Sequence, residues 1–282
     1  MKKKICMILV AVFVAVLGTS TFFIINHYKE ATKQAELYGE LAELVDAAAQ
    51  TDAATEPLEQ IPYSEEKMLL PELAELYQQN GDLVGWISVA DTKINYPVMQ
   101  SVNEPNFYLK HGFDKDYSDY GCPYVQEDCD VQEPSDNLVI YGHHMSNGSM
   151  FAHLEKFKSK DFWSEHRTIT FNTLTDKQAY EIVAVFRTVV YTDSPDAFKY
   201  YRFVDAESAG EFDDFIGKCK ELSFYDTGVT AENGDKLITL STCEYSRNNS
   251  RLVVVAKRIT EDGGADAAKT HAEATAENER PN

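Results

Sequence analysis

The stretch LITLSTCEYSRNNSRLVVVAKRI, residues 237–259, decides the fold. It holds two runs rich in branched aliphatic residues, joined by the polar loop EYSRNNS, which is typical of two neighbouring antiparallel strands. The first run ends in Cys243 and the second begins with Arg251. Because paired strands lie about 5 Å apart, we expect these two side chains to be neighbours at one end of a sheet.

Six further runs of this kind precede that stretch. They are LVGWISV (83–89), TKINYPVMQ (92–100), CPYVQE (122–127), NLVIYG (137–142), TITFNTL (168–174) and QAYEIVAVFRTVVY (178–191). Eight strand-like runs with turn residues between them predict a mainly β protein, either a closed or nearly closed barrel or a sandwich. Phe212, Phe215, Ile216 and Leu222 recur at helical spacing and predict one helix before the penultimate strand.

Two helical segments are predicted ahead of the strands. Residues 31–60 are rich in Ala and Glu, with leucines at helical spacing, and predict a helical stalk or a helix packed on the domain. Residues 64–79 carry an apolar stripe and end near Asn80 and Gly81, which suits a C-cap. We expect this stripe to dock on the domain.

The N-terminus carries an apolar run that is long enough to cross a bilayer as a helix. This run, residues 5–25, contains no charged side chain and follows Lys2, Lys3 and Lys4. By the positive-inside rule these lysines predict a cytoplasmic N-terminus, with the rest of the chain outside the cell. A cleaved signal peptide is the alternative, but its apolar region is usually shorter, and no A-x-A-like site precedes the polar residues. We therefore predict an uncleaved single-pass anchor.

Composition limits the domain count and the partners. The 282 residues, 44% of them hydrophobic, are enough for one main globular domain. The 46 acidic residues outnumber the 26 basic ones, and the resulting net charge of -20 argues against nucleic acid as a partner. Residues 261–282 have almost no large apolar side chain and are expected to be disordered.

The five cysteines follow no disulfide-rich pattern. Cys122 and Cys129, in GCPYVQEDCD, can pair across a local turn or form half of a zinc site. Their separation along one extended strand is too long for a disulfide, and no second pair of zinc ligands is evident. Unpaired cysteines are therefore our interpretation.

Residue types that serve thiol catalysis lie at the ends of three predicted strands. The run NLVIYGHHM, residues 137–145, ends its strand near Gly142 and presents His143 and His144. Neighbours in a strand point to opposite sides, so at most one of these histidines is expected to face a given site. An arbitrary cysteine is usually a small hydrophobe and an arbitrary strand-end arginine a solvated charge. A histidine at a third strand end favours a catalytic site instead.

The combination of TLSTC (239–243), Arg251 and YGHHM (141–145) resembles a class B sortase. Other segments are also similar to that class. They are DLVGWISVADTKINYPVMQ (82–100), YLKHGF (108–113), YDTGVTAENGDKLITLSTC (225–243), the predicted helix that precedes residue 225, and the N-terminal helices. The resemblance covers residues 64–259 and implies a closed eight-stranded sortase-type β-barrel with N-terminal helices. It divides the chain into an anchor (1–30), a helical stalk or linker (31–63), a catalytic domain (64–260) and a disordered tail (261–282).

The resemblance also implies the roles of individual residues. Cys243 becomes the nucleophile, His143 the catalytic histidine and Arg251 the arginine that opens the last strand. Ser241 and Glu244 are expected to contact the sorting peptide, and Leu109 to lie in the same groove. His144 is then a neighbour of the site and not the acid. No metal or cofactor is implied, and no acidic cluster has the EF-hand spacing.

Sortases cleave a short sorting motif near the C-terminus of a secreted protein, form a thioacyl enzyme, and pass the acyl group to an amine of a peptidoglycan precursor or of a pilin. The resemblance therefore implies a membrane-anchored enzyme with an extracellular catalytic domain, in a bacterium of Gram-positive type. Two alternatives stay open: an extracellular cysteine peptidase that releases its product to water, and a non-catalytic cell-wall binding module. A papain-like fold does not fit, because there the cysteine begins a helix.

The chemistry of the residue types agrees with these roles. Ordinary pKa values of ~8.5 for cysteine and ~6.5 for histidine leave both groups largely neutral at neutral pH, so an ion pair between thiolate and imidazolium is expected to be a minority state. A protonated histidine donates to the leaving amine, and a neutral one accepts a proton from the incoming amine. Arg251, with a pKa above ~12, cannot be a base and is expected to hold the carbonyl and stabilise the oxyanion.

Overall fold

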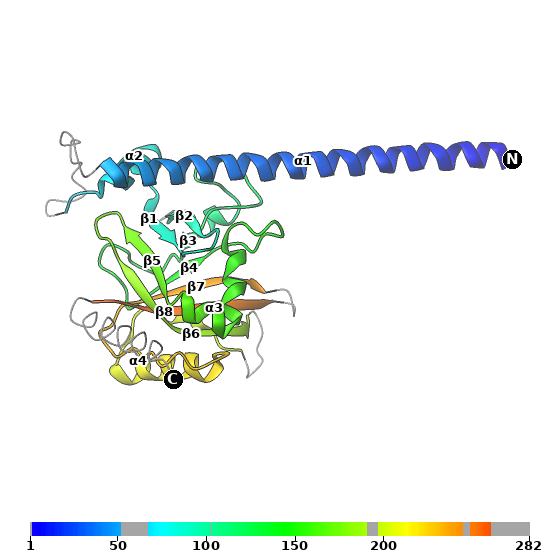
Figure 1. Ribbon diagram of the computed structural model, residues 1–282. Helices are drawn as coiled ribbons and strands as arrows, with labels where there is room; N and C mark the ends of the chain where they lie inside the picture. Colours follow the sequence, from blue (N-terminus) through cyan, green and yellow to red (C-terminus); the bar gives the residue numbers. More distant parts are fainter. Residues whose placement is uncertain (1, 52–66, 102, 191–196, 245–248, 261–282) are drawn as a thin grey trace, which may run out of the picture.

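The core of the molecule is a closed barrel of eight strands, in the order β1-β2-β3-β4-β7-β8-β6-β5 (Figure 1). The computed structural model describes residues 2–51, 67–101, 103–190, 197–244 and 249–260. The strands are β1 (Leu83–Ser88), β2 (Asn95–Met99), β3 (Tyr124–Val125), β4 (Asn137–Tyr141), β5 (Thr168–Thr173), β6 (Ala179–Val189), β7 (Leu237–Glu244) and β8 (Ser250–Arg258). Each predicted strand-like run contributes one strand, and the closed barrel is confirmed over the sandwich.

The register of β4 and β7 sets the position of the site. These strands are parallel neighbours, with Asn137 beside Leu237 and Tyr141 beside Ser241. Both strands therefore end at the same rim of the barrel. Their residues are almost fully buried on both faces, because one face lies inside the barrel and the other is covered by further elements. This burial agrees with the continuous apolar run of residues 138–140 in β4, whereas β7 also buries the hydroxyl side chains Thr239, Ser241 and Thr242.

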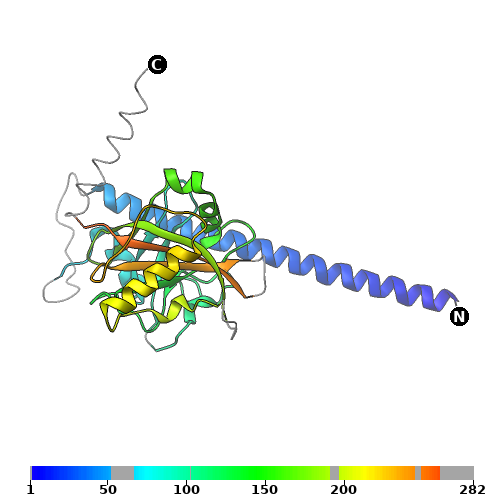
Figure 2. The ribbon, with the colours of Figure 1, turned by 90° about the horizontal axis from the view of Figure 1, so that it is seen from below.

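Helices and short 3-10 turns cover the outside of the barrel. They are α1 (Lys2–Thr51), α2 (Pro71–Gln79), η1 (Phe107–Leu109), η2 (Phe151–Lys158), α3 (Lys160–Glu165), η3 (Tyr200–Arg202) and α4 (Ala209–Leu222). The helix predicted before the penultimate strand is α4, which lies across the barrel against β6 (Figure 2). It is capped by the Ser208 side chain, which accepts from the Glu211 amide, and it buries Phe212, Phe215 and Ile216.

The apolar N-terminal run and the predicted stalk form one continuous helix, α1, of 50 residues. Its N-terminal half projects far from the barrel, and its C-terminal half lies along it (Figure 1). Tyr38, Leu41 and Val45 are buried in that contact, so the stalk segment packs on the barrel as far as it is described. In the described part of the chain, α1 is the one helix long and apolar enough to cross a membrane.

The helix predicted over residues 64–79 begins later than expected. Residues 67–70 are not helical, and α2 starts at Pro71. Proline disfavours helical backbone in the residue before it, and Leu70 is extended, with its amide bonded to the Leu174 carbonyl at 2.7 Å. The docking of the stripe is confirmed, because Leu73 and Leu76 are buried. Residues 64–66 lie outside the described residues.

All five cysteines are free, as interpreted from the sequence. Cys122, Cys129 and Cys219 are buried, whereas Cys243 is half-buried. The Cys122 thiol lies 3.5 Å from the Pro97 carbonyl, and the Cys129 thiol lies 3.4 Å from that of Asn137. Both thiols therefore have a hydrogen-bond acceptor that a serine hydroxyl can also use, and we expect Cys122→Ser and Cys129→Ser to have little effect on activity.

The buried thiols are expected to resist alkylation in the folded protein. Burial raises the pKa of Cys129 to about 12, and burial also raises the pKa values of Cys122 and Cys219 well above the ordinary range. Iodoacetamide should label these three at least about 100-fold more slowly than Cys243, as followed by mass spectrometry of tryptic peptides. In denaturant all of them should react. Labelling of Cys122 or Cys129 in native buffer as fast as Cys243 would contradict this expectation.

Candidate active site

The thiol and the guanidinium come together because β7 and β8 pair in one register. Cys243 lies directly opposite Arg251 in this antiparallel pair. Side chains of directly opposed residues project from the same face of a sheet, with Cβ atoms about 5 Å apart. The loop between the strands leaves both residues at the rim, where each is half-buried. The strand register therefore confirms the prediction that Cys243 and Arg251 are neighbours.

His143 follows the end of β4 and is held there by backbone contacts. The Gly142 amide donates to the Ser241 carbonyl at 3.1 Å, which extends the β4–β7 ladder by one bond. The His143 carbonyl accepts from the Phe151 amide at 2.8 Å. A Cβ on Gly142 would lie 2.5 Å from the buried Phe151 ring, so glycine is required for this close approach.

The ring of His143 contacts the backbone of η1. Its Nε2 atom lies 2.7 Å from the Leu109 carbonyl oxygen. A carbonyl can only accept, so Nε2 carries a hydrogen and Nδ1 is the nitrogen left to exchange a proton. Leu109 was expected to lie in the groove for the peptide, and the residue is 39% exposed. The contact that the structure shows is from its carbonyl to the histidine.

The surroundings of His143 keep its ring mainly neutral at neutral pH. Burial lowers the pKa of His143 below its ordinary value and is the largest influence. The hydrogen bond to Leu109 and the charge of Asp119 raise this pKa, while the charges of Lys110 and Arg251 lower it. A neutral imidazole is suited to accept a proton at Nδ1.

His144 holds the backbone of Cys243. Its Nδ1 atom donates to the Cys243 carbonyl at 3.0 Å, and the same atom lies 3.9 Å from a Glu155 carboxylate oxygen. The two rings therefore bond to different elements, His143 to η1 and His144 to the end of β7.

The other predicted substrate residues lie beside this centre. The Ser241 side chain is only 1% exposed, and its hydroxyl shares a 2.6 Å hydrogen bond with that of Tyr200, from η3. Tyr200 is itself 1% exposed, so neither hydroxyl is open to a peptide in this structure. Glu244 ends β7 opposite Ser250, and its side chain lies outside the described residues. The sequence around Tyr200 carries no motif that marks it for this position.

Within the ranges that the structure describes, no group of three or more His, Cys, Asp or Glu side chains is placed to hold a metal ion.

The closed barrel carries Cys243 and Arg251 at one rim, where His143 follows the neighbouring strand β4. The model of the sortase domain matches residues 87–259, and the chain belongs to the sortase family. Sortase B of Listeria monocytogenes is 34% identical over 191 residues, which cover 67% of this chain and 74% of the relative. Sortase B of Staphylococcus aureus is 29% identical over 191 residues, 67% of this chain and 75% of the relative.

Solved structures agree with this class. A Staphylococcus aureus sortase B–substrate complex superposes with a TM-score of 0.69 at 25% identity, covering 83% of this chain and 99% of that one. The sortase resemblance noted in the sequence is thus confirmed, with the predicted barrel. The protein is a class B sortase, a cysteine transpeptidase of the type that anchors surface proteins.

Proposed function

We propose that the protein cleaves a sorting motif near the C-terminus of secreted proteins, through a thioacyl enzyme on Cys243, and transfers the acyl group to an amine of a peptidoglycan precursor or of a pilin. The observation that carries the proposal is the register that sets Arg251 opposite Cys243, at the rim where His143 follows β4. Sortase membership supports the reaction type, and a Staphylococcus aureus relative has been solved as a substrate complex.

In the first half of the reaction, the Cys243 thiolate attacks the scissile carbonyl carbon and the carbonyl π electrons move to oxygen. Arg251 stabilises that oxyanion, because its guanidinium is always charged and faces the same rim. The C–N bond then breaks, and the leaving amine takes a proton from Nδ1 of the His143 imidazolium. A thioester on Cys243 and a neutral His143 remain.

In the second half, neutral His143 accepts a proton at Nδ1 from the incoming amine as its nitrogen attacks the thioester. The C–S bond breaks, and Cys243 leaves as a thiolate. The lowered pKa of His143 favours this base role. The lowered pKa of His143 makes the imidazolium a minority form at neutral pH, so acylation, which needs the imidazolium, is the step more sensitive to pH.

The N-terminal helix is the proposed membrane attachment. Residues 5–25 are apolar and, where their side chains are described, exposed along α1, which suits a lipid environment. With Lys2, Lys3 and Lys4 in the cytoplasm, the barrel lies outside the cell. We keep the division into anchor (1–30), helical connector (31–63) and catalytic domain (64–260) as part of the proposal, and the tail (261–282) lies outside the described residues.

The proposal is tested on the full-length protein in detergent micelles by mass spectrometry. The protein is incubated with a library of sorting peptides, with and without triglycine, diaminopimelate or a lysine-containing pilin peptide. Acyl mass on Cys243 that moves to an amine supports the transpeptidase and identifies the motif. Acyl mass that passes to water alone, whatever amine is supplied, indicates the peptidase alternative. A Cys243 that forms no adduct and alkylates slowly indicates the binding module.

The pH dependence of kcat/KM provides a further prediction. The productive enzyme carries one proton shared between thiol and imidazole, so activity is lost as falling pH protonates His143 as well. Because the pKa of His143 is lowered, this acidic limb should lie below pH ~6.5. Lys110→Met removes a charge that lowers this pKa, so the limb should move to higher pH by a few tenths of a unit.

The matched variant is Asp119→Asn, since Asp119 pairs with Lys110 at 2.8 Å and raises the pKa of His143. Its acidic limb should move to lower pH. If the acidic limb of both variants moved in the same direction, the group that titrates there would not be His143.

A further inference from the structure

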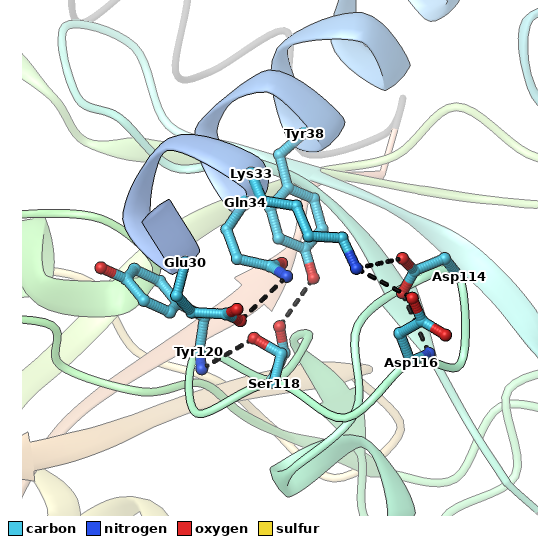
Figure 3. A network of polar contacts seen from close by, with 9 residues as sticks. Glu30, Lys33, Gln34, Tyr38, Asp114, Asp116, Ser118 and Tyr120 are labelled. Atoms are coloured by element: carbon cyan, nitrogen blue, oxygen red, sulfur yellow. Dashed lines mark hydrogen bonds and ion pairs between the residues drawn. The ribbon is translucent and has the colours of Figure 1, made fainter. Parts of the chain in front are cut away.

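Helix α1 contacts the segment of chain that lies behind the catalytic histidine. The Tyr38 hydroxyl donates to the Gly121 carbonyl at 2.6 Å, and Lys33 pairs with Asp116 at 2.8 Å and with Asp114 at 3.3 Å (Figure 3). All these partners belong to one loop, which runs from η1 towards β3. The helix that carries the apolar run therefore also holds a loop of the catalytic barrel.

Gly121 transmits this contact because it lies directly against the backbone of η1. Its φ is +60°, and a Cβ there would be 2.5 Å from the Tyr108 carbonyl oxygen and 2.9 Å from that of Leu109. The next residue, Cys122, donates its amide to the Tyr108 carbonyl at 2.9 Å. No side chain separates Gly121 from the Leu109 carbonyl, so a displacement of one displaces the other.

The Leu109 carbonyl is the group that accepts from Nε2 of His143. A second connection runs parallel to the first, because the Tyr120 hydroxyl accepts from the Asn147 side chain at 3.2 Å, in the loop that follows His143. Three contacts in series thus lead from Tyr38 to the catalytic ring: hydroxyl to Gly121, Gly121 to Leu109, and Leu109 to His143.

We propose that Tyr38 is a positioning residue for His143, acting through Gly121 and the Leu109 carbonyl. The inference rests on the proposed catalytic role of His143. It makes α1 a working part of the active site in addition to a membrane attachment, because the orientation of the ring depends on a hydroxyl that the helix supplies.

The positioning of His143 is assigned to Tyr38 and not to the ion pairs of Lys33 beside it. Its side chain is 4% exposed, and burial raises its pKa well above the ordinary value, so the hydroxyl stays protonated and donates at every working pH. Lys33 and Asp116 are largely exposed, and exposed ion pairs contribute little to holding a structure. The Tyr38 ring packs edge-on against Tyr96 at 5.4 Å, so phenylalanine can occupy the same place without the hydroxyl.

The test compares Tyr38→Phe with two control variants in the full-length protein in micelles. Tyr225→Phe removes an equivalent bond, from a tyrosine hydroxyl to the Phe157 carbonyl at 2.6 Å, elsewhere on the barrel. Lys33→Met removes the ion pairs from the same helix. Turnover is measured with the peptide and amine identified above, and the pKa of His143 by NMR of protein labelled with [13C]histidine, assigned with His143→Gln.

Tyr38→Phe should lower kcat about 3- to 10-fold with KM within about twofold, because the ring is less often in the productive orientation. It should also lower the pKa of His143, since the bond to Leu109 raises that pKa. Neither control should change kcat by more than about twofold. Tyr38→Phe and Tyr225→Phe should lower the melting temperature by similar small amounts, since each loses one hydroxyl bond to a carbonyl, and Lys33→Met should melt close to the parent.

A Tyr38→Phe protein whose kcat and His143 pKa match those of Tyr225→Phe overturns the proposal. So does a rise in KM with unchanged kcat. The NMR measurement needs no substrate, so it decides the positioning role even if no acyl enzyme forms. Failure of the proposed function would instead appear in the parent protein, as absence of acyl mass on Cys243.

Discussion

Cys243→Ala is expected to lower acyl transfer by at least about 10⁴-fold, the largest effect of any single substitution in this chain. Without the sulfur no thioester can form, and neither His143 nor Arg251 supplies another nucleophile. Product formation from peptide and amine, followed by mass spectrometry, measures the loss. Cys243 lies half-buried at the end of β7, so the variant should fold and melt like the parent.

Cys129→Ser is the matched control, because it alters a thiol that is buried beside the Asn137 carbonyl, away from the rim. It should keep near-normal turnover. If Cys243→Ala retained turnover within tenfold of the parent, the nucleophile would be a different group. His143→Ala should be almost as damaging, since both proton transfers pass through its Nδ1 atom.

Arg251→Ala is expected to lower kcat by about 10²- to 10³-fold, because the developing oxyanion loses a charged donor directly opposite Cys243. Arg251→Lys should recover only a small part of this loss. A lysine replaces a planar fork of donors with a single point charge, which cannot hold the carbonyl in the same geometry. Single-turnover measurement of acylation separates this effect from peptide binding.

Arg258→Lys provides the control for this pair of variants. Arg258 ends the same strand, β8, at the far rim of the barrel, where it lies opposite Tyr180. The same chemical change there should leave kcat within about twofold. Full activity of Arg251→Lys would show that charge alone is sufficient and that the fork geometry has no role.

The sequence was informative about the strands because each is a short apolar run bounded by turn residues. It was less informative about helix ends. A single α1 was not expected from an apolar segment and an alanine-rich one, yet no proline interrupts residues 26–51, so the helix continues. The start of α2 was placed too early because the apolar stripe before Pro71 has helical spacing even though its backbone is extended.

At the site, the sequence indicated the groups that we propose to react, but not the groups that hold them. Cys243 and Arg251 are brought together by a short loop, which a local pattern can predict. The bonds from His143 to Leu109, from His144 to Cys243 and between Tyr200 and Ser241 join residues 34, 99 and 41 positions apart. No periodicity encodes such contacts, and two of them use backbone carbonyls, which every residue has.

The strand order has a consequence for the time at which the enzyme becomes active. The last two strands, β7 and β8, lie between β4 and β6, so β4 has no partner on that side until β7 is made; Asn137, for example, pairs with Leu237. During synthesis the edges of β4 and β6 therefore stay open until residue 258 has emerged, a long interval for sheet edges that can pair wrongly. The same two strands deliver the thiol and the guanidinium. A chain that lacks these strands therefore has no reactive thiol at the site, and the active site forms at the same time as the barrel closes.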